Sequence, residues 1–320
     1  RSQRRVLTME RSKRGGYALG AVAAAFYGLN PLFALPLYEA GLGTDSVLFY
    51  RYVLAVAMLG GLMLVRRQSF AVRRSEILPL AAMGLLFSFS SLFLFLSYRH
   101  MAAGIASTLL FLYPLLVAAI MAVGFRERTS AATLIAILLA LAGVGLLYRG
   151  GDGETLSMAG VALVFLSSLC YAVYIVGVNR SSLASFPTEK LTFYALLFGL
   201  SVYVVRLRLG LDLQAVPTPA LWVNAVSLAL FPTILSLVAM AAAIHRIGST
   251  PTAILGALEP VTALFFGVAV FGEQLTPRIV AGVSLILFAV LLVVAGGTIA
   301  AHLPFRGRVA HLLHQLRRAR

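Results

Sequence analysis

The chain has 320 residues, of which 60% are hydrophobic and 12% charged, and its mean hydropathy is +0.94. Soluble domains are about half apolar and about a quarter charged, so this composition excludes an ordinary soluble protein and predicts an all-α integral membrane protein. The formal net charge of +15 does not indicate nucleic-acid binding, because the basic residues lie between apolar runs rather than on a soluble face.

Ten apolar runs are long enough to cross the hydrocarbon core of a bilayer, which is roughly 30 Å thick and takes about 20 helical residues. They cover residues 17–38, 46–65, 77–98, 103–124, 130–148, 157–178, 190–207, 220–243, 251–271 and 278–300. The short stretches between them carry glycine and proline turn signals and leave no room for a separate soluble domain. We therefore predict ten transmembrane helices between a basic N-terminus, residues 1–16, and a basic tail, residues 301–320.

Lysine and arginine predict the orientation, since they accumulate in short cytoplasmic loops. With the N-terminus inside, 20 of the 26 basic residues lie on the cytoplasmic side, five lie outside and Arg51 lies within a span. We expect a multi-pass protein of the cell inner membrane with both termini in the cytoplasm. In the tail, Val309, Leu312 and Leu316 have the spacing of an amphipathic helix on anionic lipid, and a frayed basic tail is the alternative.

The second half of the chain repeats the first. From the third span onward, an offset of 146 residues places "LYPLLVAAIMAVGFRE" over "LEPVTALFFGVAVFGE" without gaps. The matched pairs that carry weight are Pro114 with Pro260 and Glu127 with Glu273. Each half, 17–150 and 151–300, holds five spans, an odd number, so the second half enters the membrane from the opposite side. The sequence therefore predicts two inverted five-helix repeats around a central cavity, as in many transporters.

Prolines lie well inside four of the spans. A proline removes one backbone hydrogen bond and clashes with the preceding turn, so a membrane helix tolerates it where the freed carbonyl meets protein, water or substrate. Helix kinks are predicted at Pro31, Pro114, Pro232 and Pro260, and Pro36 is a further proline in the first span. Kinks that only improve packing are the alternative.

Glu259 is the only acidic residue well inside a span, roughly 12 Å from its start at about 1.5 Å per residue. A charge at that depth costs on the order of 3 kcal/mol or more, so its side chain should face the bundle interior or water. Three roles stay open: recognition of a substrate amine, proton coupling, and a protonated donor that holds the kink. Arg51 is a gating or ion-pair candidate that could reach Glu259 or a substrate carboxylate, or extend to the outer interface.

Tyrosine, asparagine and serine side chains also occur at mid-span positions. With Glu259, the candidate substrate-binding residues are Tyr27, Asn30, Ser91, Tyr113, Tyr171, Tyr174 and Ser236. Members on the first and sixth spans are paired three residues apart and so share a helix face. An aromatic cavity with few charges suits amphipathic or aromatic small molecules. Tyrosines at span ends, such as Tyr98 and Tyr203, are expected at the membrane interface instead.

The segments "LEPVTALFFGVAVFGEQLTPRIVAGVSLILFAVLLV" and "LYPLLVAAIMAVGFRERTSAATLIAILLALAGVGLL", with "FYRYVLA" in the second span, resemble the EamA-type repeats of the drug/metabolite transporter (DMT) superfamily. The resemblance extends over about residues 17 to 300 and is nearest to YddG-like exporters of amino acids. It implies ten helices in two inverted repeats, with a central cavity lined mainly by helices 1, 3, 4, 6, 8 and 9. The family's helix 2 arginine matches Arg51, and its common Trp-Gly in helix 1 is Tyr27-Gly28 here.

These observations predict an inner-membrane exporter of small metabolites, above all aromatic and other neutral amino acids, that works by alternating access. The alternatives are a carrier of amines or drugs, nucleosides or organic acids, with or without proton coupling, a channel, or a membrane-embedded enzyme. The five histidines lie at helix ends or in the tail, so no catalytic residues, metal or cofactor are expected. The expected partners are a small-molecule substrate and lipid, anionic at the cytoplasmic face, and no nucleic acid. We expect a monomer, with a dimer as the alternative.

Overall fold

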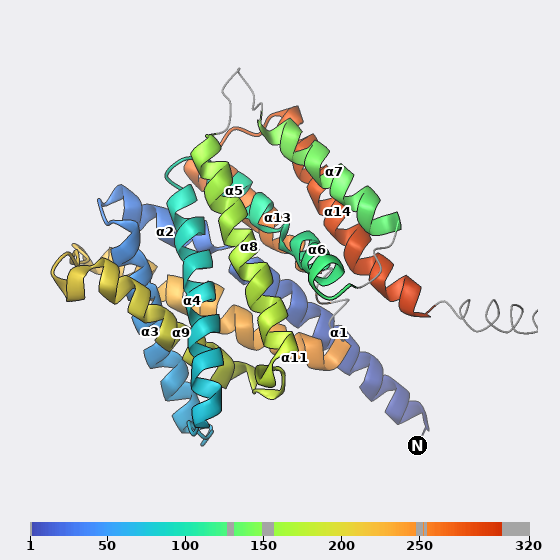
Figure 1. Ribbon diagram of the computed structural model, residues 1–320, viewed down its shortest axis with the longest axis horizontal. Coiled ribbons are helices and arrows are strands. Elements are labelled where there is room, and N and C mark those ends of the chain that lie inside the picture. The colour runs from blue at the N-terminus through green and yellow to red at the C-terminus, as the bar shows by residue number, and fades with distance from the viewer. Residues whose placement is uncertain (1, 127–130, 149–156, 248–251, 253–254, 303–320) are drawn as a thin grey trace, which may run out of the picture.

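The computed structural model describes residues 2–126, 131–148, 157–247, 252 and 255–302, which form helices and no strand. The helices, shown in Figure 1, are α1 (Ser2–Tyr27), α2 (Asn30–Glu39), α3 (Thr44–Val65), α4 (Arg74–Ser97), α5 (Ala103–Leu110), α6 (Tyr113–Gly124), α7 (Ala131–Tyr148), α8 (Met158–Arg180), α9 (Thr188–Arg206), α10 (Pro219–Ala229), α11 (Ser236–Ile247), α13 (Leu258–Phe271) and α14 (Pro277–His302). Short helical turns η2 (Ser182–Ser185) and η3 (Arg208–Gly210) and the π-helical η4 (Leu230–Leu235) complete them. The tail helix predicted after residue 302, and Glu127, lie outside the described residues.

Seven segments of the described chain are apolar helices long enough to cross a membrane, and three shorter apolar helices accompany them. The seven are Arg14–Glu39, Thr44–Val65, Arg74–Ser97, Ala103–Gly124, Met158–Arg180, Thr188–Arg206 and Pro219–Ala243. The shorter helices are Ala131–Leu147, Leu258–Phe271 and Pro277–Leu292. All fall at predicted spans, so the all-helical, multi-pass architecture is confirmed. The arrangement as ten helices in two inverted repeats stays a prediction.

Local sequence signals explain where several helices begin and end. The hydroxyl of Ser157 accepts the N–H of Gly160 at the start of α8, and that of Thr218 accepts the N–H of Leu221 at the start of α10, each at 3.3 Å. These side chains satisfy amide groups that the first turn leaves unpaired. At the end of α13, Gly272 has a φ of 67°, which a glycine adopts without the steric cost that a Cβ would bring.

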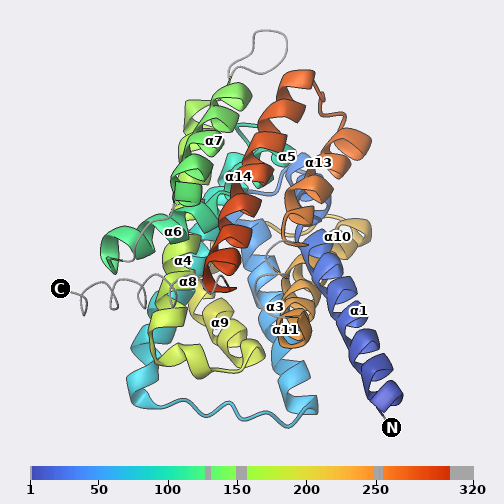
Figure 2. The same cartoon turned by 90° about the vertical axis from the view of Figure 1, so that its right-hand side faces the viewer.

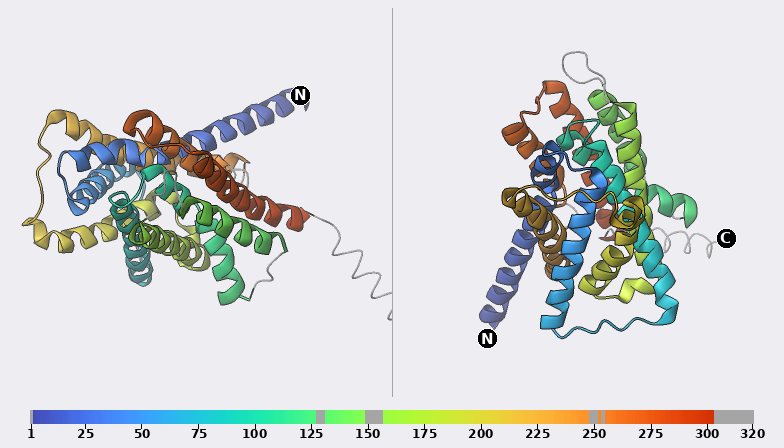
Figure 3. Two further views of the ribbon diagram at one scale, coloured as in Figure 1. Left: turned by 90° about the horizontal axis from the view of Figure 1, so that it is seen from above. Right: turned by 90° about the vertical axis from the view of Figure 1, so that its left-hand side faces the viewer.

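The helices pack in pairs that join the two halves of the chain. Helix α7 lies beside α14, as Figures 1 and 3 both show, and α1 runs along α11. Helix α4 packs against α8 and α9, and α3 also packs against α9. We call the end of the bundle where α1 begins the N-terminal end. The opposite end, which holds the connection from α13 to α14, is the far end (Figure 2).

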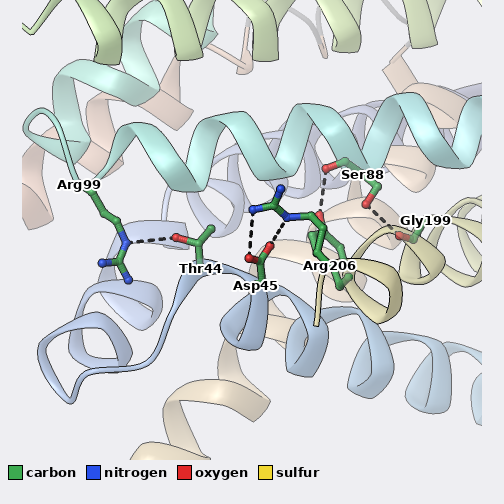
Figure 4. A network of polar contacts seen from close by, with 7 residues as sticks. Thr44, Asp45, Ser88, Arg99, Gly199 and Arg206 are labelled. Carbon is green, nitrogen blue, oxygen red and sulfur yellow. Dashed lines mark hydrogen bonds and ion pairs between the residues drawn. The ribbon is translucent and has the colours of Figure 1, made fainter. Parts of the chain in front are cut away.

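Polar contacts fasten α3, α4 and α9 to one another (Figure 4). At the far end Arg206 forms a bidentate ion pair with Asp45, with nitrogen to oxygen distances of 2.5 and 3.1 Å. Arg99 donates to the Thr44 hydroxyl at 3.2 Å, which ties the end of α4 to the start of α3. Deeper in the bundle the Ser88 hydroxyl donates to the carbonyl of Gly199 at 2.9 Å. These three helices therefore form a frame against which other helices pack.

The crossing of α4 and α9 depends on Gly84, and we expect Gly84→Leu to destabilise the protein. A Cβ on Gly84 would lie 2.8 Å from the Ala195 carbonyl oxygen, so a larger side chain would force the two backbones apart. Overpacking of this kind costs about 1–3 kcal/mol or more and should lower the Tm in detergent. Gly61→Leu is the matched control, because a Cβ on Gly61 meets no atom within 4 Å. Equal Tm values for the two variants would contradict this close approach.

Candidate substrate-binding site

The structure interrupts the regular helix at four of the prolines. The sites are residues 28–29 before Pro31, 111–112 before Pro114, the π-helical turn around Pro232, and 256–257 before Pro260. Pro36 lies inside α2. Paired interruptions therefore occur in the predicted fourth and ninth helices, at positions that match in the two halves of the sequence.

The backbone carbonyls at these interruptions have hydrogen-bond partners within the protein. The pairs are Asn30 Nδ2 with Tyr27 O at 2.8 Å, Ser168 Oγ with Leu110 O at 3.1 Å, Thr233 Oγ1 with Leu228 O at 3.2 Å, and the Glu259 N–H with Gly256 O at 3.0 Å. Three of these donors are side chains, which is how membrane helices commonly tolerate a lost backbone hydrogen bond. The interruptions are thus built into the resting fold.

Ser168 supports the interruption between α5 and α6, and we expect Ser168→Ala to lower the Tm. Its hydroxyl donates to the carbonyls of Leu109 at 3.3 Å and Leu110 at 3.1 Å. Removing a donor from a buried carbonyl costs about 1–3 kcal/mol. Ser201→Ala is the control, because Ser201 is exposed and its hydroxyl bonds within its own helix to Phe198 O. If both substitutions leave the Tm unchanged, Ser168 does not support the break.

Glu259 lies in the first turn of α13 and its side chain is buried, with 9% exposure. The interruption between α1 and α2 contacts this turn of α13. Gly28 packs so closely against the Glu259 backbone that a Cβ on residue 28 would clash with it. The Glu259 carboxylate acts electrostatically on the hydroxyls of Tyr27, Tyr113 and Tyr171. Three of the predicted site residues, from α1, α6 and α8, therefore lie within electrostatic reach of the carboxyl group on α13.

The aromatic rings of α6 and α8 continue this cluster. The rings of Tyr113 and Tyr171 meet edge to face with centroids 4.8 Å apart, and Tyr171 stacks parallel to Tyr174 at 6.0 Å. Phe87 of α4 lies 5.4 Å from the Tyr174 ring. All three tyrosines are half-buried, so part of each ring is open. Such rings offer stacking surfaces to an apolar or aromatic ligand.

Arg51 is buried in the bundle, with 2% exposure, so the alternative in which it extends to the membrane interface is wrong. Its Nε donates to the Thr233 hydroxyl of η4 at 3.0 Å, and its guanidinium carbon lies 5.2 Å from the centre of the Phe95 ring. Its charge acts on the Tyr27 hydroxyl. Among the described residues no carboxylate lies within ion-pair distance of Arg51, and no cationic side chain lies within that distance of Glu259. Arg51 and Glu259 therefore both act on Tyr27 without an ion pair between them.

The other three predicted residues serve contacts within the bundle. Ser91 accepts a hydrogen bond from the hydroxyl of Tyr52 at 2.9 Å, which joins α4 to α3. Ser236 donates to the carbonyl of Ala23 at 2.8 Å, which joins α11 to α1. Asn30 donates through Nδ2 to Tyr27 O at the interruption between α1 and α2, while its buried Oδ1 has no hydrogen-bond partner among the described residues. No hydrogen bond to the Glu259 carboxyl group is formed by the described side chains of Ser91, Ser236 or Asn30.

Two tyrosines that were expected at the membrane interface are buried instead. Tyr203 is fully buried, its hydroxyl donates to Ser88 O at 2.9 Å, and its ring meets that of Tyr52 at 4.9 Å. Tyr98 is 7% exposed and packs on Phe95 at 5.3 Å. Neighbouring helices cover both positions, which span length alone does not reveal, and their depth at the membrane interface stays a prediction.

An apolar cavity of about 240 Å³ lies beside this cluster, between α5, α6, α7 and α8. Its lining includes Leu112, Leu116, Ile137, Val144 and Phe165. Neither Glu259 nor the tyrosines belong to the lining, so this cavity is distinct from the acid and aromatic cluster. It involves the predicted fifth helix, which the family resemblance places at the periphery.

Sequence reasoning missed three side chains of the site region. Thr233 follows Pro232 directly, and a hydroxyl beside an intramembrane proline is a signal that could have identified it. Phe87 and Ser168 carry no comparable signal, because their partners lie on other helices. Only the packing of α4 and α8 brings them into place.

Comparison with known proteins places this geometry in context. The sequence model of the EamA-like transporter family matches residues 14–149 and again 158–295. The chain is 27% identical over 249 residues to the uncharacterized transporter YcbK of Bacillus subtilis (strain 168), covering 74% of this chain and 79% of that protein. It is 26% identical over 208 residues to an uncharacterized transporter of Archaeoglobus fulgidus, covering 63% and 71%. A solved crystal structure shares the fold with a TM-score of 0.64 at 18% identity, covering 87% of this chain and 95% of the other.

Proposed function

The chain belongs to the EamA-like transporter family, and from this premise we propose that it exports neutral amino acids, aromatic ones included, by alternating access. The same family model matches the chain twice, over 14–149 and 158–295, and five spans are predicted in each stretch. An odd number of spans inverts the second repeat, which supports two gates around one central site. The helix interruptions near Glu259 then lie at the depth where such carriers bind substrate.

The observation that carries the substrate class is a buried carboxylate surrounded by phenols. Glu259, Tyr27, Tyr113 and Tyr171 offer one acceptor for a substrate ammonium group and three partly open rings for its side chain. Arg51, which also acts on Tyr27, is the cation for a substrate carboxylate. Spaced opposite charges with aromatic walls match a zwitterion that carries an apolar side chain.

The proposed orientation places the N-terminal end of the bundle in the cytoplasm of the cell and the far end outside. The distribution of basic residues supports it, since the sequence predicts 20 of the 26 on the same side of the membrane as the N-terminus. In this proposal the protein is an inner-membrane monomer whose basic termini face anionic lipid. Substrate enters from the cytoplasm and leaves at the far end.

The test is flux into and out of proteoliposomes containing the purified protein. The panel contains phenylalanine, leucine, tyramine, a nucleoside and 3-phenylpropionate, each with and without an imposed proton gradient. We expect saturable flux with counterflow for both amino acids, and much weaker flux for tyramine and 3-phenylpropionate, which each lack one charge. Preference for a one-charge compound or the nucleoside would reassign the substrate class. Non-saturable flux without counterflow would indicate a channel.

A further inference from the structure

Glu273 closes the end of α13 in a way that turns its carboxylate toward another helix. The Glu273 N–H donates to the Gly267 carbonyl at 3.0 Å, across the left-handed residue Gly272 that ends α13. Its Oε1 then accepts the N–H of Ala103 at 2.7 Å, and the N–H of Gly104 lies 3.3–3.4 Å from the two carboxylate oxygens. Glu273 thus connects α13 to the first residues of α5.

The start of α5 depends on this contact. Its N-cap residue is Ala102, whose side chain cannot accept a hydrogen bond from the first turn. The amides at a helix start are unpaired and carry partial positive charge, so a carboxylate is their preferred partner. Gly104 lets the carboxylate approach, because a Cβ there would lie 2.9 Å from Glu273 Oε2 and from Leu264. The cap of α5 is therefore supplied from the other half of the chain.

The hydrogen bonds of Glu273 join two helices from opposite halves of the chain at the far end of the bundle. There α5 packs against α13. Beyond the interruption at residues 111–112, α6 packs against α8, α7 and α14 instead. Figure 2 shows α6 on the opposite side of the molecule from α1 and α11. In the described residues, α5 of the fourth predicted helix therefore packs on α13 of the ninth at the far end, whereas α6 beyond the interruption packs mainly on α7, α8 and α14.

We propose that Glu273 is the latch of the far-end gate: its hydrogen bonds to Ala103 and Gly104 hold α5 against α13, and they must break before the site opens to that side. This inference rests on the alternating access proposed above. It assigns a conformational role to a residue outside the substrate-binding cluster. Glu273 acts on the position of α5 and does not contact the substrate.

The experiment measures how fast a thiol inside the gate reacts with a membrane-impermeant maleimide added at the far end. The reporter is Ser107→Cys, a buried position on α5, in a Cys170→Ala background that removes the chain's one cysteine. We expect Glu273→Ala to raise the labelling rate about tenfold or more. Glu273→Gln, whose amide oxygen still accepts from Ala103, should give a smaller increase. Glu39→Ala is the matched control, because Glu39 is an exposed carboxylate at the end of α2.

A second measurement separates gate opening from misfolding. Spin labels at His100 and Leu275, exposed positions that flank the latch, should move apart in the Glu273→Ala protein and not in the Glu39→Ala protein. Unchanged labelling and unchanged spin-label distance in a folded Glu273→Ala protein would overturn the latch. Neither readout needs a substrate, so a panel without flux would refute the proposed function and leave the latch to be decided by these measurements.

Discussion

Glu259→Gln is expected to abolish most of the transport of zwitterionic amino acids while the protein still folds. The substitution keeps the size of the buried side chain and removes its charge, so a substrate ammonium group loses its charge-assisted partner. Hydrogen bonds to charged groups contribute about 1.5–3 kcal/mol, which corresponds to roughly a 10- to 100-fold loss in apparent affinity. The measurement is the concentration dependence of phenylalanine flux in proteoliposomes.

The control for this result is Glu39→Gln, an equivalent change in an exposed carboxylate. It should leave the flux unchanged. A Glu259→Gln protein with wild-type apparent affinity and rate, at equal reconstitution, would remove Glu259 from the site. A protein that keeps its affinity but loses stimulation by a proton gradient would instead favour the coupling role for this residue.

Tyr171→Ala is expected to have the second largest effect, and to act selectively on aromatic substrates. Tyr171 contacts the rings of both Tyr113 and Tyr174, so its removal breaks the continuous aromatic wall. Aromatic pairs contribute about 0.5–1.5 kcal/mol beyond the area they bury, so phenylalanine should lose roughly 2- to 10-fold more affinity than leucine. Competition of both amino acids against labelled substrate measures this ratio.

The matched variant for this prediction is Tyr171→Phe, which keeps the ring and removes the hydroxyl. It should preserve the ratio of phenylalanine to leucine affinity. If Tyr171→Ala weakens both amino acids equally, the ring supports the fold of the site and does not select the substrate. If neither changes, the substrate does not reach the wall formed by α6 and α8.

The charges of Arg51 and Glu259 illustrate why a pair of buried ions can favour binding over stability. A buried charge without a partner is costly, and a direct ion pair would satisfy both groups within the protein. The described structure has no ion pair between them: Arg51 donates to Thr233, and no cationic side chain of the described residues lies within ion-pair distance of Glu259. In the proposed carrier, a zwitterion supplies the missing counter-charges to both. Substrate binding then offsets part of the free energy that burying the two unpaired groups costs the folded protein.

Composition and periodicity alone determined the all-helical membrane architecture, the positions of the helices and the places where prolines interrupt them. These features are local, because the length of an apolar run and the missing N–H of proline act within a single helix. The burial of Glu259 was also predicted, because the only mid-span acid has to face the bundle interior or water.

Only the tertiary structure decided which polar groups serve the site and which serve the fold. Ser91 and Ser236 resemble site residues in sequence, yet each bonds to a neighbouring helix. Arg51 and Tyr203 could have reached the interface, and packing buries both. The role of Glu273 depends on amides 169 and 170 residues away. A hydrogen-bond partner on another helix leaves no signal in the local sequence. Helix packing therefore decides which groups these side chains contact.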